Sequence, residues 1–96
     1  MQASAWSNGN GSYGLRVGAP NRREFFHRQW TEILLEIDGD THPISITPGF
    51  WNRCPELRSP IIRDWLQEHR TLSWPSGKPP RVELVPLGDN HFRVVQ

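Results

Sequence analysis

The sequence has little of several residue types, and each shortage excludes a class of protein. Among its 96 residues there is one cysteine, Cys54, so no disulfide can form within the chain, which fits a reducing compartment. Apolar residues make up only 35% of the chain, and no run approaches the ~20 residues of a membrane-spanning helix. The first twelve residues lack the basic and apolar regions of a signal peptide. We therefore expect a cytoplasmic protein without a membrane span.

Neither basic nor acidic residues are in large excess. Eleven basic and ten acidic residues give a net charge of +1, which by itself indicates neither a nucleic acid nor a membrane as partner. Lysine is almost absent, because all the basic residues except Lys78 are arginines. Arginine suits bidentate binding of phosphate or carboxylate. A GC-rich genome produces the same bias, and we favour that explanation.

The common catalytic and cofactor motifs are also missing. The chain has no glycine-rich phosphate loop, no G-x-S-x-G, no H-E-x-x-H and no C-x-x-C. Its four histidines and Cys54 do not have the spacing of metal ligands. We interpret Cys54, next to Pro55, as a packed small side chain rather than a nucleophile. The sequence thus predicts no catalytic residues, no metal and no cofactor, and a protein that is not an enzyme. No residue pattern identifies a known family.

What the chain does contain are nine prolines, eight glycines and five tryptophans. The prolines and glycines predict many short elements, and the large rings can form a small core. Residues 1–12 are mostly Ser, Asn and Gly with a single Trp6, which is typical of a disordered tail. We expect residues 13–96 to form a single α+β domain, since the length leaves no room for two domains.

The clearest element is a hairpin over residues 31–46. Two alternating segments flank Asp38-Gly39, a pair of residues that favours a two-residue type I′ turn. The resulting register pairs Ile37 with Asp40 and Ile33 with Ile44. Pro43 cannot donate to a ladder, which indicates an edge strand and leaves strand-mediated dimerisation open, with the oligomeric state undetermined.

A second hairpin is predicted from residue 81 to the C-terminus. A three-residue loop, Gly88-Asp89-Asn90, pairs Pro86 with Phe92 and Leu84 with Val94, and it needs Asn90 in the left-handed conformation. A short strand over residues 13–17 completes the expected sheet.

Three segments have the residues that begin helices. Asn21 can cap a helical turn over residues 22–28, and Thr47-Pro48 precedes a turn over residues 49–53. Ser59-Pro60 begins the best helix, residues 60–70, which has an apolar stripe. We therefore predict an α+β fold. Its antiparallel sheet has four to five strands, formed by two hairpins and an N-terminal strand, packed against one main helix and short helical turns.

Residues 49–60 form the most distinctive segment. It is dense in residues used for recognition, and as a loop it would bind a protein partner through its aromatic and charged side chains. The candidate partner-binding residues are Trp51, Arg53, Glu56 and Arg58. The alternative, which we favour, is a structural elbow with Trp51 and Leu57 in the core and Glu56 paired locally with an arginine.

A basic segment over residues 22–30 mixes cations with aromatic rings. Nucleic-acid-binding surfaces combine these groups, because rings stack on bases and arginines hold phosphates. The candidate nucleic-acid-binding residues are Arg22, Arg23, His27, Arg28 and Arg63. The alternative, again favoured, is a solvated helical turn whose rings reach the core. The leading hypothesis is a small non-catalytic interaction or regulatory module that binds a protein, and the second is a small nucleic-acid-binding regulator.

Overall fold

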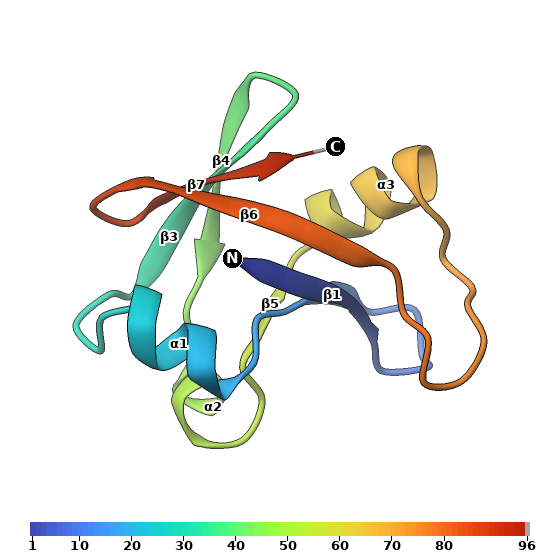
Figure 1. Cartoon of the computed structure of the whole chain (residues 1–96), viewed down its shortest axis with the longest axis horizontal. Helices are drawn as coiled ribbons and strands as arrows, with labels where there is room; N and C mark the ends of the chain where they lie inside the picture. Colours follow the sequence, from blue (N-terminus) through green and yellow to red (C-terminus); the bar gives the residue numbers. More distant parts are fainter. Residues whose placement is uncertain (96) are drawn as a thin grey trace.

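The computed structural model describes residues 1–95, in which seven strands form one mixed sheet (Figure 1). The strands are β1 (Gln2–Ser7), β2 (Tyr13–Arg16), β3 (Glu32–Ile37), β4 (Asp40–Ser45), β5 (Glu56–Arg58), β6 (Arg81–Gly88) and β7 (His91–Val95). Their order across the sheet is β4-β3-β7-β6-β1-β2-β5, and among these described strands β3 and β7 alone are parallel neighbours. The two edge strands, β4 and β5, also contact each other. The sheet therefore curls until it is nearly a closed barrel.

This architecture corrects the expected fold class. The prediction of a purely antiparallel sheet of four to five strands against one main helix is wrong. The expected hairpins are present, but β7 of one pairs in parallel with β3 of the other, through Leu34–His91 and Leu35–Phe92. Two further strands, β1 and β5, complete the sheet. A parallel pairing between segments more than fifty residues apart leaves no local signal in the sequence.

The register of the first hairpin is confirmed. Ile37 pairs with Asp40 and Ile33 with Ile44, and the turn residues Asp38 and Gly39 have φ angles of 52° and 86°. Positive φ at both central residues is the requirement of a type I′ turn. The position of β4 at an edge of the sheet, expected from Pro43, is confirmed as well.

The second hairpin matches its prediction except at the tip. Pro86 pairs with Phe92 and Leu84 with Val94 as expected. Gly88 then pairs with His91 after an irregularity between Pro86 and Gly88, and the left-handed residues are Gly88 and Asp89 rather than Asn90. Since Gly88 takes this conformation without steric cost, the chain turns within a shorter loop.

Residues 1–12, expected as a disordered tail, differ most from the expectation. Residues 2–7 form β1, which pairs with β6 on one side and β2 on the other. Ala3 and Ala5 are buried in the barrel, while the alternate side chains point outward. A strand between two neighbours gains backbone hydrogen bonds on both edges. Ordering this weakly apolar segment therefore does not depend on large side chains.

Three short helices complete the structure: α1 (Ala19–Phe25), α2 (Pro48–Asn52) and α3 (Pro60–His69). The start of α3 is as predicted, and the Ser59 hydroxyl accepts a hydrogen bond of 3.2 Å from the backbone N–H of Ile61. Helix α1 begins earlier than predicted, because Pro20 lies in its first turn rather than ending the strand before it. No helix among residues 1–95 is long and apolar enough to cross a membrane.

The core fills the barrel. Helices α1 and α2 lie together at one end of it (Figure 1), where the Arg22 guanidinium donates a 2.8 Å hydrogen bond to the Phe50 carbonyl. The centre of the Phe26 ring lies 5.0 Å from the centre of the Phe50 ring and 5.0 Å from that of the Phe92 ring. These rings join α2, the segment after α1, and β7.

Candidate functional site

The outward face of β6, β1 and β2 brings together cations from distant parts of the chain. Ser4 of β1 pairs with Arg16 of β2 on one side and with Arg81 of β6 on the other. Directly paired residues point to the same face of a sheet, and neighbouring strands lie about 4.8 Å apart. The two arginines therefore flank the small Ser4 side chain, with about 10 Å between their Cα atoms.

A pocket of about 590 Å³ lies over β1 between these two arginines. One wall comes from Val17 and Gly18 after β2, and the other from residues 77–79 before β6. Its charged lining residues are Arg16, Lys78 and Arg81, and no acidic residue lines it. We call it the cation pocket.

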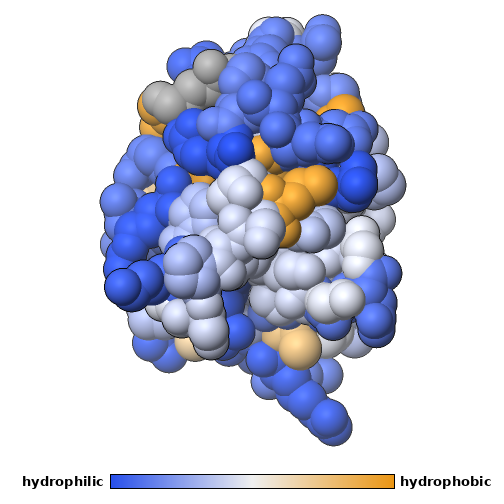
Figure 2. Space-filling view, turned by 90° about the vertical axis from the view of Figure 1, so that its right-hand side faces the viewer, coloured by the Kyte–Doolittle hydropathy of each residue, from blue (hydrophilic) through white to orange (hydrophobic). Residues whose placement is uncertain are grey.

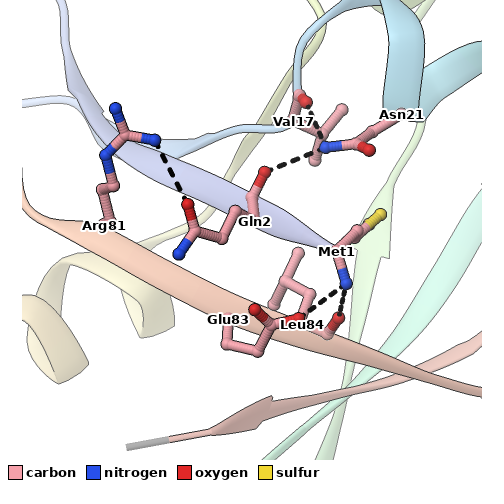
Figure 3. A network of polar contacts seen from close by, with 7 residues as sticks. All are labelled: Met1, Gln2, Val17, Asn21, Arg81, Glu83 and Leu84. Carbon is pink, nitrogen blue, oxygen red and sulfur yellow. Dashed lines mark hydrogen bonds and ion pairs between the residues drawn. The ribbon is translucent and has the colours of Figure 1, made fainter.

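A network of hydrogen bonds holds the wall of the cation pocket (Figure 3). The Arg81 guanidinium donates to the side-chain oxygen of Gln2 at 3.2 Å. The side-chain amide of Asn21 in α1 donates to the backbone carbonyls of both Gln2 (2.9 Å) and Val17 (3.0 Å). On the adjacent part of β6, the amino group of Met1 lies 2.7 Å from the Glu83 carboxylate. Asn21 thus ties β1 to the end of β2 beside the pocket.

The cations of the pocket are little neutralised by protein carboxylates. Within residues 1–95, Lys78 and Arg81 make no ion pair, and Arg16 lies 4.0 Å from the Glu56 carboxylate. Guanidinium carries five N–H donors, of which the contact between Arg81 and Gln2 uses one. Most donors of the pocket therefore remain open to a ligand.

An aromatic ring and a further arginine extend the same outer face. Trp6 and Arg58 lie on either side of Gly14 in the register, and the Arg58 guanidinium stands 4.3 Å from the centre of the Trp6 ring. The buried carboxylate of Glu56 accepts from Arg58 at 3.3 Å. We call the outward surface of β6, β1, β2 and β5 the basic face. Its residues are Gln2, Ser4, Trp6, Arg16, Glu56, Arg58, Lys78, Arg81 and Glu83, whose carboxylate is paired with the Met1 amino group.

A second, smaller pocket of about 250 Å³ lies at the other end of β2. Tyr13, Arg58 and Arg63 contribute to its lining. The Tyr13 hydroxyl donates to the Leu72 carbonyl, and its ring meets that of Trp74 edge-on at 6.3 Å. Arg63 is partly engaged by Asp64 at 3.7 Å. This pocket is therefore smaller than the cation pocket, and its arginines are more closely paired with protein carboxylates.

The structure divides the residues expected to bind a protein partner. Trp51 is half-buried against Phe50, and Arg53 is exposed at the end of α2. Glu56 and Arg58 instead belong to the three-residue strand β5 on the basic face. The local pairing expected for Glu56 is found with Arg58, and Leu57 is fully buried. The contacts thus join Glu56 and Arg58 to β2 and β1 rather than to Trp51.

The residues expected to bind nucleic acid are also divided. The guanidinium groups of Arg22 and Arg28 stand 5.7 Å and 4.9 Å from the Trp51 ring, so they cover that ring. Arg23 and His27 are exposed, and the His27 ring packs edge-on against Trp30 at 4.9 Å. Arg63 lies apart from them on α3, beside the smaller pocket. None of these five residues lines the cation pocket.

Sequence reasoning missed the main residues of the pocket: Arg16, Lys78 and Arg81. One signal was present in the sequence, since polar Gln2 and Ser4 alternate with apolar Ala3 and Ala5 as in a strand. The polar composition of the segment outweighed this alternation. Nothing local indicated that residues 16 and 81 become neighbours of the same residue, Ser4.

Comparisons of the chain with protein-family models, with curated proteins and with solved structures find no match. Among residues 1–95, no group of three or more His, Cys, Asp or Glu side chains has an arrangement that could hold a metal ion. Cys54 is free and half-buried. The arguments below therefore rest on the geometry of the basic face.

Proposed function

We propose that this protein is a non-catalytic interaction module that binds nucleic acid through its phosphates at the basic face. The observation that carries the proposal is the cation pocket, where Arg16, Lys78 and Arg81 meet without an acidic lining residue. Phosphate contacts by arginine and lysine supply most of the sequence-independent affinity of nucleic-acid-binding proteins. The ring of Trp6 on the same face adds a surface of the kind on which bases stack.

The distribution of charge supports the same partner. In the nearly closed barrel, β3 lies opposite β1, three strands away through β6 and β7. Its acidic side chains, Glu32 and Glu36, therefore point away from the basic face, and Glu36 is paired with Arg93 of β7. The two carboxylates of the basic face, Glu56 and Glu83, are each paired with a cation, so Arg16, Lys78 and Arg81 leave an excess of positive charge around β1 that favours a polyanion there.

The remaining surface offers little for an apolar partner. The side that carries α3 is mostly hydrophilic, with a small hydrophobic area near its centre (Figure 2). Among the described residues, Leu87 and Val95 are the exposed large hydrophobic side chains, and both belong to the β6–β7 hairpin. A protein partner at Trp51, Arg53, Glu56 and Arg58 stays a prediction from the sequence. The structure adds no further support for it.

Binding is tested by fluorescence anisotropy with labelled single-stranded DNA, duplex DNA and single-stranded RNA. We expect binding at micromolar protein in 50 mM salt that weakens steeply toward about 200 mM, because phosphate contacts release counterions. Arg81→Gln should weaken binding roughly tenfold and lower the salt slope by about one. The matched control is Arg93→Gln, which removes the same charge from exposed β7 and should change the affinity little. Equal losses in the two variants, or no binding at 50 mM salt, would refute the proposal.

A second prediction uses the buried carboxylate of the basic face. Glu56→Gln keeps the shape of the side chain but removes the negative charge that lies near Arg16 and Arg58. If a bound phosphate lies about 7 Å from the Glu56 carboxylate in water, the repulsion between the two charges is worth ~0.6 kcal/mol. Removing this repulsion should raise the affinity for DNA roughly threefold. The same anisotropy titration measures this change. Glu68→Gln, on the exposed surface of α3, provides the control, and an unchanged or lower affinity for Glu56→Gln would contradict the charge argument.

A further inference from the structure

We infer that the cation pocket binds the terminal phosphate monoester of a nucleic-acid strand, rather than a phosphodiester within the strand. This inference rests on the proposed function and names the part of the ligand that the pocket takes. It begins from the shape of the site. Ser4 is small, so the space above β1 stays open between the longer side chains of Arg16 and Arg81. The backbone on both sides forms walls that give the hollow its depth.

The charge of the pocket favours a monoester. A phosphodiester carries one negative charge, whereas a terminal phosphate carries about −1.5 to −2 at neutral pH and has three strong acceptor oxygens. Three cations converge here from three segments of the chain: Arg16, Lys78 and Arg81. Within residues 1–95, two of them have no carboxylate partner, and the third has one only at 4.0 Å. Three cations with so little protein countercharge suit a doubly charged phosphate monoester better than a singly charged phosphodiester.

Part of the site is also held in place before any ligand binds. Arg81 is anchored by Gln2, whose backbone is in turn held by Asn21 (Figure 3). Lys78 lies in a turn closed by the 3.0 Å hydrogen bond from its backbone N–H to the Pro75 carbonyl. Preorganised donors lose less conformational entropy when a ligand binds. The anchored side chain is that of Arg81, while for Lys78 the turn fixes the position of the backbone from which its side chain extends.

The size of the pocket indicates what enters with the phosphate. Small-molecule sites usually have volumes of about 300–1,000 Å³. At about 590 Å³, the pocket is large enough to hold a whole terminal nucleotide together with its phosphate. Trp6 lies two residues beyond Ser4 on the same strand, and since the Arg58 guanidinium covers one side of its ring at 4.3 Å, the next base of the strand would stack on the other side.

The experiment compares one oligonucleotide sequence with a 5′-phosphate, a 3′-phosphate or hydroxyl groups at both ends. We expect one phosphorylated form to bind about fivefold more tightly than the hydroxyl form, which corresponds to one added charge in a partly enclosed site. Arg16→Gln and Lys78→Gln should abolish this preference, while Arg93→Gln should retain it. Circular dichroism of each variant checks that the fold is kept.

The outcomes separate the inference from the proposed function. Equal affinity for all three ends overturns the inference and leaves nucleic-acid binding standing. No binding of any oligonucleotide overturns both. A third arm adds free nucleoside monophosphate as competitor. If the mononucleotide binds as tightly as the phosphorylated strand, the ligand is the phosphate itself and the role of a strand end is refuted.

Discussion

Replacing Phe50 by alanine is expected to lower the free energy of unfolding by about 3–5 kcal/mol. Phe50 is 1% exposed and is the buried residue of α2. Its ring contacts Phe26 and Trp51, at 5.0 Å and 5.4 Å between ring centres. Truncation would leave a cavity at the end of the barrel, where α1 and α2 meet. The loss of contacts and the cavity both contribute to the cost.

Urea and thermal unfolding measure this effect. A loss of 3 kcal/mol or more corresponds to a fall in Tm of more than about 12 °C for a domain of this length. Phe50→Leu is the matched variant, and it should cost much less because most of the volume is kept. Below its Tm, the alanine variant should bind DNA with unchanged affinity, since Phe50 does not line the cation pocket. A cost below 1 kcal/mol for Phe50→Ala would contradict the packing described for this end.

Replacing Gly14 by alanine is the second large expected loss of stability, about 2–3 kcal/mol. Gly14 is buried in β2, and a Cβ atom added there would overlap the Leu57 carbonyl oxygen of β5. It would also lie 3.1 Å from the carbonyl carbon of Leu57 and 3.2 Å from the Cα of Arg58. These are backbone atoms, so no side chain can rotate away. Strands β2 and β5 would have to separate.

The matched control is Gly49→Ala in α2. The nearest atom to an added Cβ there is the Thr47 hydroxyl oxygen at 3.7 Å, an ordinary contact. A Gly→Ala change in compatible backbone stabilises by about 0.4–1 kcal/mol. In the same denaturant titration, Gly14→Ala should therefore lower the free energy of unfolding, whereas Gly49→Ala should raise it. Equal stabilities would show that β2 and β5 do not approach as closely as described.

Gly14→Ala should also affect binding. Gly14 lies between Trp6 and Arg58 in the register, and the absence of a side chain there accompanies their approach to 4.3 Å. Separation of β5 from β2 would move Arg58 away from the Trp6 ring. We therefore expect weaker binding of single-stranded DNA even at temperatures where the variant stays folded, in contrast to the Phe50 variant.

Local chemistry explains which parts of the fold could be predicted. The Asp38-Gly39 turn requires positive φ, and this requirement together with the alternation of the flanking residues is enough to define the register of β3 and β4. Likewise, Ser59 and Pro60 mark the start of α3 through a cap that involves residues two positions apart. In each case the interacting groups are close in sequence, so the pattern contains both partners.

Other parts depend on partners far away in the chain. β1 has few apolar side chains, and it is ordered because β2 and β6 provide hydrogen bonds on both of its edges. β5 is only three residues long, which is too short for a detectable alternation. The same limit affected the site, since Glu56 and Arg58 could be selected as candidates while their neighbours Arg16 and Trp6 could not.

By itself, the sequence determined the two long hairpins, helix α3 and the lack of catalytic motifs, because these depend on residue type and short spacing. The tertiary structure alone decided the parallel pairing of β3 with β7, the nearly closed barrel and the cation pocket. The physical reason is the sheet. Residues 4, 16 and 81 become neighbours through backbone hydrogen bonds, which are the same for every residue type, so no side-chain pattern specifies which strands meet.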